Sequence, residues 1–110
     1  MSNGEFDDEA LEELRDDLGE AFGEFVAGFF TNAAAELQAL QAGLAGGGLA
    51  AAAERAHKLK GTAGYLGAVG LSDCLAQLQR AAEAGDTAGA GRLAGEAVEA
   101  LARLRAHVTA

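Results

Sequence analysis

The chain has 110 residues and a net charge of −9, half of its residues are hydrophobic, and it contains no proline. Its length fits one domain that buries a core unaided, and the scarcity of aromatic and β-branched residues argues against a sheet. Ten of its seventeen acids lie in residues 5–24, so the chain is a poor candidate for nucleic acid, which demands a basic face. The single cysteine, Cys74, fits a reducing compartment.

The N-terminal stretch MSNGEFDDEALEE has neither the basic region nor the apolar core of a signal peptide. No apolar run approaches the roughly 20 residues that span a membrane. We therefore expect a cytoplasmic protein that does not bind membranes, with residues 1–6 disordered. The acidic residues that follow are expected to form a solvated helix face, and a role in docking a partner is the alternative.

Apolar spacing predicts five helical segments. The first covers about residues 8–18, with three leucines on one side, and either extends past Gly19 or ends there. The second covers about residues 20–44, and three adjacent glycines at 46–48 then break the chain. Its apolar residues recur at three- and four-residue steps, which is one helical stripe. They are Phe22, Phe25, Phe29, Ala33, Leu37, Leu40 and Leu44.

The third helix is predicted over about residues 49–66, with Gly67 and Gly70 marking the turn out of it in a left-handed stop. The fourth covers about residues 71–84. Asp86 is a natural N-cap for the last helix, which ends near Val108. The stripes of the three helices are Leu49, Ala52, Ala56, Leu59, Ala63 and Leu66; Leu71, Cys74, Leu75 and Leu78; and Leu93, Ala97, Leu101, Leu104 and Val108.

Short turns between long amphipathic helices place consecutive helices antiparallel. The sequence therefore predicts an all-α fold, an antiparallel up-down four-helix bundle with an additional short N-terminal helix. The whole chain, residues 1–110, is expected to form this single domain as a monomer.

The third helix contains the stretch HKLKGTAGYLG, residues 57–67. At 100° per residue, His57, Lys60, Gly61 and Gly64 share one face, which flanks the buried stripe. Each glycine costs about 1 kcal/mol relative to alanine in a helix interior, so their presence asks for a reason. Around His57 the sequence places three cations, a small basic patch in an acidic protein. They are Arg55, Lys58 and Lys60.

Several ordinary roles compete for these residues. His57 could be a histidine at the edge of the core, with glycines that ease helix packing. A di-iron site would use Glu54 and His57 as a Glu-x-x-His pair, but the second pair that such a site needs is missing, because Leu104 precedes His107 by three. Ser72, Asp73 and Cys74 are not spaced with His57 as a nucleophile and its base would be. We therefore expect no metal site.

A histidine can instead carry a phosphoryl group covalently. Neutral imidazole is a good nucleophile, and a cation such as Lys60 can neutralise the oxygens of the transferring group. The donor protein must bring its reactive atom to within roughly 3 Å of the ring nitrogen. A bulky residue one turn along would obstruct that approach, so Gly61 and Gly64 are interpreted as room for another protein.

At HKLKGTAGYLGA, residues 57–68, the chain resembles the histidine phosphotransfer (HPt) domain of two-component phosphorelays. The family pattern is His-x-Leu-Lys-Gly, then small residues, then an apolar residue, Gly and Ala. The resemblance continues loosely through LSDCLAQLQRAAEAGD. The matching residues of the motif are His57, Leu59, Lys60, Gly61, Ala63, Leu66, Gly67 and Ala68.

The resemblance implies that His57 is phosphorylated through Nε2, that Lys60 contacts the phosphoryl group and that Gly61 allows the partner to approach. In some family members a glutamine on the next helix orients the histidine, and Gln79 has the matching spacing; an ordinary solvated glutamine is the alternative. Thr62 stands where Ser or Ala is more usual. The expected docking surface consists of Arg55, Lys58, Gly61, Gly64 and Tyr65, although Tyr65 could equally be a half-exposed side chain with a solvated hydroxyl.

The expected function is therefore a relay between the receiver domains of a hybrid histidine kinase and of response regulators, without a cofactor, any Mg²⁺ being held by the receiver. Dimeric histidine-kinase bundles carry a Thr-Pro after their histidine, which this chain lacks, and it has no room for an ATP-binding domain. Two alternatives stay open: a non-catalytic bundle that binds a receiver or kinase, and the phosphoacceptor domain of a chemotaxis-type kinase.

Overall fold

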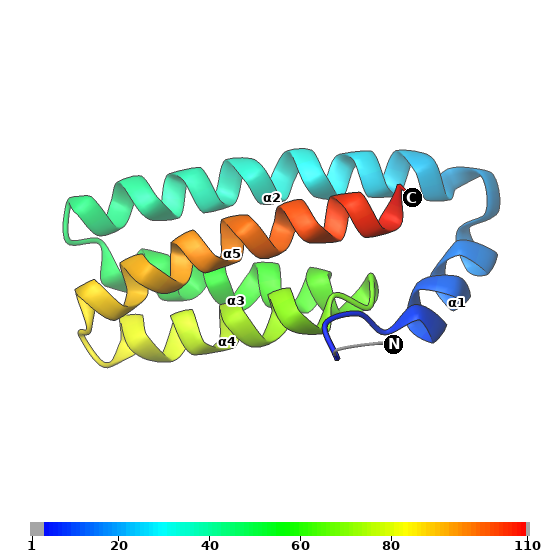
Figure 1. Ribbon diagram of the computed structural model, residues 1–110. Coiled ribbons are helices and arrows are strands. Elements are labelled where there is room, and N and C mark those ends of the chain that lie inside the picture. Colours follow the sequence, from blue (N-terminus) through cyan, green and yellow to red (C-terminus); the bar gives the residue numbers. More distant parts are fainter. Residues whose placement is uncertain (1–3, 110) are drawn as a thin grey trace.

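The computed structural model describes residues 4–109 and is built from helices (Figure 1). The predicted all-α class is confirmed, and no strand occurs among these residues. Five α-helices and one short 3-10 turn follow one another along the chain. They are α1 (Asp8–Leu18), η1 (Gly19–Ala21), α2 (Phe22–Ala45), α3 (Leu49–Tyr65), α4 (Val69–Glu83) and α5 (Thr87–Val108).

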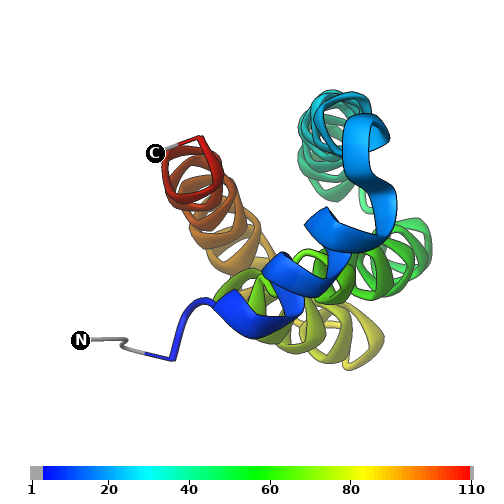
Figure 2. The same ribbon diagram turned by 90° about the vertical axis from the view of Figure 1, so that its right-hand side faces the viewer.

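Helices α2 to α5 form the predicted antiparallel bundle. Each packs against the helices before and after it in the chain, and α5 returns to pack against α2, which closes the bundle. The bundle is elongated, 41 Å along its longest axis. Viewed from its end, α1 lies across the bundle as the additional short helix (Figure 2).

The predicted apolar stripes form a single core of leucine, alanine and phenylalanine. Fully burying a leucine stabilises the fold by about 1.5–3 kcal/mol. Seven leucines are almost completely buried: Leu37, Leu40, Leu66, Leu71, Leu75, Leu78 and Leu104. The stripe drifts around α2, so that Val26 and Phe30 also enter the core there, whereas Phe22 and Phe25 are only partly buried. Cys74, Leu101 and Val108 likewise lie at the margin of the core.

Helix ends follow the local sequence at most turns. Asp86 caps α5 as predicted, its Oδ1 accepting a hydrogen bond from the Gly89 N–H at 2.9 Å. The chain does break at Gly19, which has φ of +53° and starts the 3-10 turn. Gly67 has φ of +68° and ends α3 in the expected left-handed conformation. The prediction for Gly70 is wrong, because this residue lies in the first turn of α4, which begins at Val69.

An extended segment before α1, residues 5–7, crosses the turn between α3 and α4; we call it the N-terminal strap. The Asp7 N–H donates to the Gly67 carbonyl at 2.7 Å, and the Gly70 N–H donates to the Glu5 carbonyl at 2.9 Å. Arg103 Nε of α5 donates to Glu5 Oε1 at 2.6 Å, which raises the pKa of the guanidinium. The strap therefore ties the α3–α4 turn to α5.

Aromatic stacking adds a second link between the strap and α5. The Phe6 ring stacks on the His107 ring with centroids 4.0 Å apart, and His107 Nε2 lies 2.6 Å from Asp8 Oδ1. We expected residues 1–6 to be disordered. Residues 1–3 lie outside the described part, whereas Glu5 and Phe6 have these defined contacts, because α5 offers them a cation and an aromatic ring.

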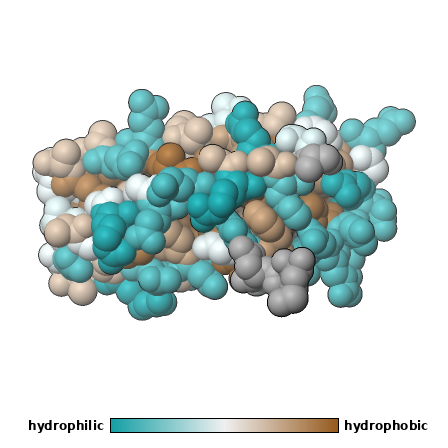
Figure 3. Space-filling view, viewed as in Figure 1, coloured by the Kyte–Doolittle hydropathy of each residue, from teal (hydrophilic) through white to brown (hydrophobic). Residues whose placement is uncertain are grey.

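The surface is hydrophilic over the end of the molecule where α1 lies (Figure 3). The carboxylates of α1 at Glu9, Glu12, Glu13, Asp16 and Asp17 are all exposed, as expected for a solvated helix face. Within residues 4–109, no helix combines the length and the apolar character needed to cross a membrane.

Candidate functional site

His57 lies near the middle of α3, where alanines leave its ring on the rim of the bundle. The preceding residue, Ala56, is completely buried between the helices, and Ala53, one turn earlier, is also buried. One step around the helix, His57 is exposed. The small neighbouring side chains therefore leave the imidazole exposed beside a groove between α3 and α4. The sequence predicted that the face of His57 flanks the buried stripe, and it does.

The imidazole is held by a glutamine from the next helix. His57 Nδ1 lies 3.3 Å from Gln79 Oε1, and Gln79 Nε2 donates to Glu83 Oε2 at 3.2 Å. An amide oxygen can only accept, so Nδ1 must carry the proton in this contact. In neutral imidazole the other nitrogen, Nε2, then keeps its lone pair. Nε2 makes no hydrogen bond within the described residues.

A shallow groove of about 530 Å³ is lined by both His57 and Gln79. Alanines form much of its wall, and its polar groups are the histidine, the glutamine and two carboxylates. The lining residues are Ala50, Ala53, Glu54, His57, Gln79, Ala82 and Glu83. No cation lines this groove, so its charge is negative and differs from that of the surface one turn further along α3.

Lys60 is the cation that shares the face of His57. It lies one turn along α3 and is partly buried, and its carbonyl accepts a hydrogen bond from the Ser72 hydroxyl of α4 at 3.5 Å. Its ammonium group forms no ion pair with any acid in residues 4–109. An unpaired ammonium on this face can bind an anion presented to the histidine.

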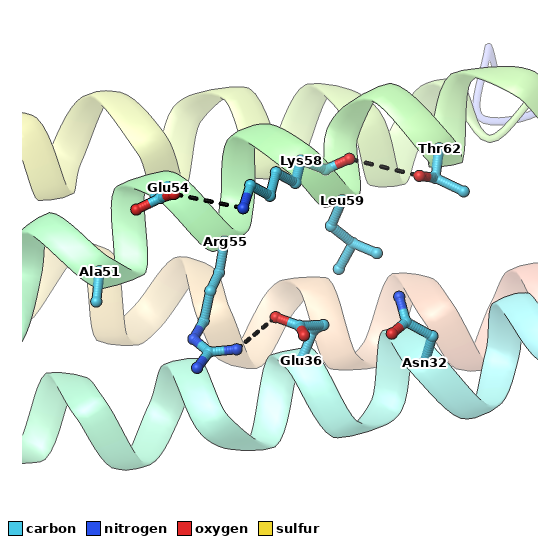
Figure 4. Close-up of a pocket in the computed structure, with 8 residues that line it drawn as sticks. All are labelled: Asn32, Glu36, Ala51, Glu54, Arg55, Lys58, Leu59 and Thr62. Atoms are coloured by element: carbon cyan, nitrogen blue, oxygen red, sulfur yellow. Dashed lines mark hydrogen bonds and ion pairs between the residues drawn. The ribbon is translucent and has the colours of Figure 1, made fainter.

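The other two cations of the expected basic patch are paired within the protein. Arg55 points away from the histidine face toward α2, where its Nη1 lies 2.6 Å from Glu36 Oε2 (Figure 4). Lys58 Nζ lies 3.3 Å from Glu54 Oε1 along α3. Arg55 is two residues before His57 and so about 160° around the helix. The basic patch around His57 is therefore smaller than its neighbours in the sequence suggested, because Arg55 does not share a surface with His57.

Gly61, Gly64 and Tyr65 are exposed along α3 beyond the histidine. A Cβ atom built on Gly61 or Gly64 would meet nothing within 4 Å outside its own turn. Packing against another helix therefore does not explain these glycines, and that alternative is wrong. Tyr65 has 70% of its surface exposed, which fits the reading of a solvated side chain and leaves its ring available for contact.

The structure does not bring together the residues of the two alternative sites, the metal site and the nucleophile with its base. No group of three His, Cys, Asp or Glu side chains within residues 4–109 has the arrangement of metal ligands. Ser72 donates to the Lys60 carbonyl, and the Cys74 thiol lies 3.3 Å from the Leu93 carbonyl. Burial raises the pKa of the Cys74 thiol, which lowers its reactivity as a nucleophile.

Sequence reasoning missed Glu83, which contacts Gln79. The spacing of Gln79 and Glu83 could have revealed this contact, because residues four apart share one face of a helix. Glu36, the partner of Arg55, had no such signal, since it lies 19 residues away on α2.

Comparisons with known proteins identify the family and support the fold. The sequence matches the family model described as Hpt domain over residues 24–108. No curated protein matches the chain. A solved structure does: histidine-containing phosphotransfer protein B (HptB) from Pseudomonas aeruginosa PAO1 superposes with a TM-score of 0.91 at 25% identity, over 98% of this chain and 94% of that chain. The chain therefore belongs to the Hpt domain family and is a histidine phosphotransfer protein of a phosphorelay.

Proposed function

We propose that His57 is the residue that carries the phosphoryl group, through Nε2, between the aspartates of receiver domains. The observation that supports this most directly is the contact of Nδ1 with the Gln79 amide oxygen at 3.3 Å. It leaves Nε2 unprotonated in the neutral ring, and the ring is exposed beside the bare surface at Gly61 and Gly64.

The transfer is a displacement at phosphorus. The Nε2 lone pair attacks the phosphorus of the aspartyl phosphate, the Nε2–P bond forms, and the P–O bond breaks with its electrons leaving on the carboxylate. Nδ1 keeps its proton and its contact with Gln79, so the phosphorylated ring carries the imidazolium charge. Transfer to the second receiver runs the same step in reverse.

Lys60 is proposed to stabilise the phosphoryl oxygens during both steps. Lys60 lies one turn from His57 on the same face of α3, and its ammonium group has no acidic partner in the described chain. A hydrogen bond to a charged group contributes about 1.5–3 kcal/mol. The change Lys60→Ala should therefore slow transfer at least about tenfold. Arg92→Ala is the control, because Arg92 lies on α5 and is paired with Glu96.

Receiver domains are proposed to dock along α3 over Gly61, Gly64 and Tyr65, with Lys58 at the edge of this surface. The relay needs no cofactor of its own, and Mg²⁺ is expected in the acidic pocket of the receiver. The protein is proposed to act as a monomer in the cytoplasm and to be a transfer intermediate without kinase activity. Upstream and downstream receivers would use the same face in turn, because there is one phosphoacceptor.

The decisive experiment is transfer of radiolabelled phosphate from purified, phosphorylated receiver domains to the protein and to His57→Gln. We expect acid-labile, alkali-stable label on the unchanged protein only. The control His107→Gln should accept label normally, because His107 contacts Phe6 and Asp8 at the far side of the bundle. Label that persists in His57→Gln would overturn the assignment of the phosphoacceptor.

The same assay separates the alternatives. A folded protein that binds receivers but takes no label from any of them would be a non-catalytic binding module. Label that comes only from a separate ATP-binding kinase domain, and never from a receiver, would indicate the phosphoacceptor domain of a chemotaxis-type kinase.

A further inference from the structure

Glu83 contacts the glutamine that holds the phosphoacceptor. It lies one turn beyond Gln79 on α4, and its Oε2 accepts a hydrogen bond from Gln79 Nε2 at 3.2 Å. Glu83 has no ion-pair partner within residues 4–109, so this contact is not the by-product of a salt bridge elsewhere. Two consecutive hydrogen bonds therefore run from Glu83 through Gln79 to His57.

The direction of the Gln79 amide decides which nitrogen of His57 is the nucleophile. A glutamine side chain can present either its oxygen or its NH₂ group to a neighbour. If the NH₂ group faced His57, Nδ1 would have to accept with its lone pair. The proton of the neutral ring would then lie on Nε2, which could not attack phosphorus.

A carboxylate removes this ambiguity because it can only accept hydrogen bonds. Glu83 must therefore be met by the NH₂ group of Gln79, and the amide oxygen then faces His57. We propose that Glu83 is a positioning residue that orients the Gln79 amide, and through it holds the Nδ1–H tautomer of His57 that transfers phosphate. This proposal rests on the assignment of His57 as the phosphoacceptor.

The position of Glu83 at the end of α4 indicates that this residue does not stabilise the fold. Glu83 is the last residue of α4, where the negative end of the helix dipole disfavours a carboxylate. It is exposed and lies at the edge of a groove walled by alanines, so it supports no packing. Neutral or basic residues at this position should therefore keep the fold or raise its melting temperature.

The test uses four variants of the full chain. Glu83→Ala removes the acceptor, and Glu83→Gln replaces the carboxylate by an amide that can accept or donate. Glu83→Lys offers a donor, which should turn the amide oxygen of Gln79 away from His57. Glu54→Gln is the matched control, because Glu54 lines the same groove but pairs with Lys58 and not with Gln79.

The first readout is the tautomer of the neutral His57 ring, measured by ¹⁵N NMR and assigned by the loss of its signals in His57→Gln. We expect the Nδ1–H form in the unchanged protein and in Glu54→Gln. A mixture is expected in Glu83→Ala and in Glu83→Gln, and mainly the Nε2–H form in Glu83→Lys. An unchanged tautomer in both Glu83→Ala and Glu83→Lys would overturn the proposal.

The second readout is the rate of phosphate transfer from a phosphorylated receiver domain. One hydrogen bond corresponds to about two- to tenfold in rate, so Glu83→Ala should fall in that range and Glu83→Lys below it. The rate of Glu83→Gln should lie between those of Glu83→Ala and the unchanged protein, and Glu54→Gln should match the unchanged protein. A shifted tautomer with an unchanged rate would also overturn the proposal. If the unchanged protein takes no label, the proposed function fails, and the tautomer alone decides the role of Glu83.

Discussion

Two pairs of glycines lie within ten residues of each other and have opposite surroundings. At Gly61 and Gly64 an added Cβ would meet nothing within 4 Å. At Gly67 it would overlap the carbonyl oxygen of Asp7, and at Gly70 it would lie 2.6 Å from Glu5 Cγ. The first pair leaves the surface of α3 open, whereas the second leaves space for the N-terminal strap.

The difference has an energetic counterpart. Glycine at 61 and 64 weakens α3 by about 1 kcal/mol each relative to alanine, and no contact within the described chain offsets that loss. Glycine at 67 and 70 admits the hydrogen bonds of Asp7 and Glu5 to the α3–α4 turn. An open glycine does not by itself indicate a docking surface, since Gly91 of α5 is equally open. At Gly61 and Gly64 the open surface lies on the face of the exposed His57, whereas Gly67 and Gly70 serve the fold.

The largest expected effect on stability comes from Gly67→Ala. Alanine in the left-handed conformation costs about 1–2 kcal/mol, and the clash with Asp7 would release strap hydrogen bonds of about 0.5–1.5 kcal/mol each. With two such hydrogen bonds, we expect a total loss of about 2–5 kcal/mol, measured by urea unfolding. Gly85→Ala is the control, because Gly85 has φ of +78° with nothing within 4 Å. Equal losses in the two variants would show that the strap adds nothing.

Gly61→Gln is expected to act on transfer and not on the fold. The new side chain would extend over the surface where a receiver is proposed to dock, and the transfer rate should fall about tenfold, which corresponds to about 1.4 kcal/mol. Gly91→Gln is the control, since Gly91 is an equally open helical glycine on α5. An unchanged rate in Gly61→Gln would contradict the explanation of the first glycine pair.

Phe6→Ala should lower stability without changing phosphate transfer, because Phe6 belongs to the N-terminal strap and not to the proposed docking surface. Removing the stack on His107 should destabilise the fold by about 0.5–1.5 kcal/mol, the usual contribution of an aromatic pair. Thermal unfolding measures the loss, and the rate of phosphate transfer from a receiver should stay the same. A slower rate in a folded variant would mean that the strap also shapes the surface used by partners.

The smallest expected effect is a gain from Gly64→Ala. Alanine at this open helical position should stabilise the protein by about 0.5–1 kcal/mol. The midpoint of urea unfolding should rise accordingly, and Gly70→Ala should shift it in the opposite direction because of the contact with Glu5. A loss of stability in Gly64→Ala would indicate that this glycine, too, serves the fold.

Much of the molecule could be predicted from short stretches of sequence. Apolar spacing located all five helices, and Asp86 and Gly67 marked their ends. The pattern around His57 placed the histidine, Lys60 and both open glycines on one face of α3. These features depend on the 3.6-residue period and on backbone geometry, which act within one or two turns.

The rest was decided by how the helices pack. Arg55 lies two residues from His57 but faces Glu36 on α2, and Gly70 lies beside Glu5 instead of in a turn. The amide of Gln79 is turned toward His57 by Glu83, a contact that also needs α3 and α4 to meet at this register. The sequence by itself determined the helices and their faces, because these follow from local periodicity. Only the tertiary structure decided which faces meet, because that depends on the mutual rotation of segments far apart in the chain.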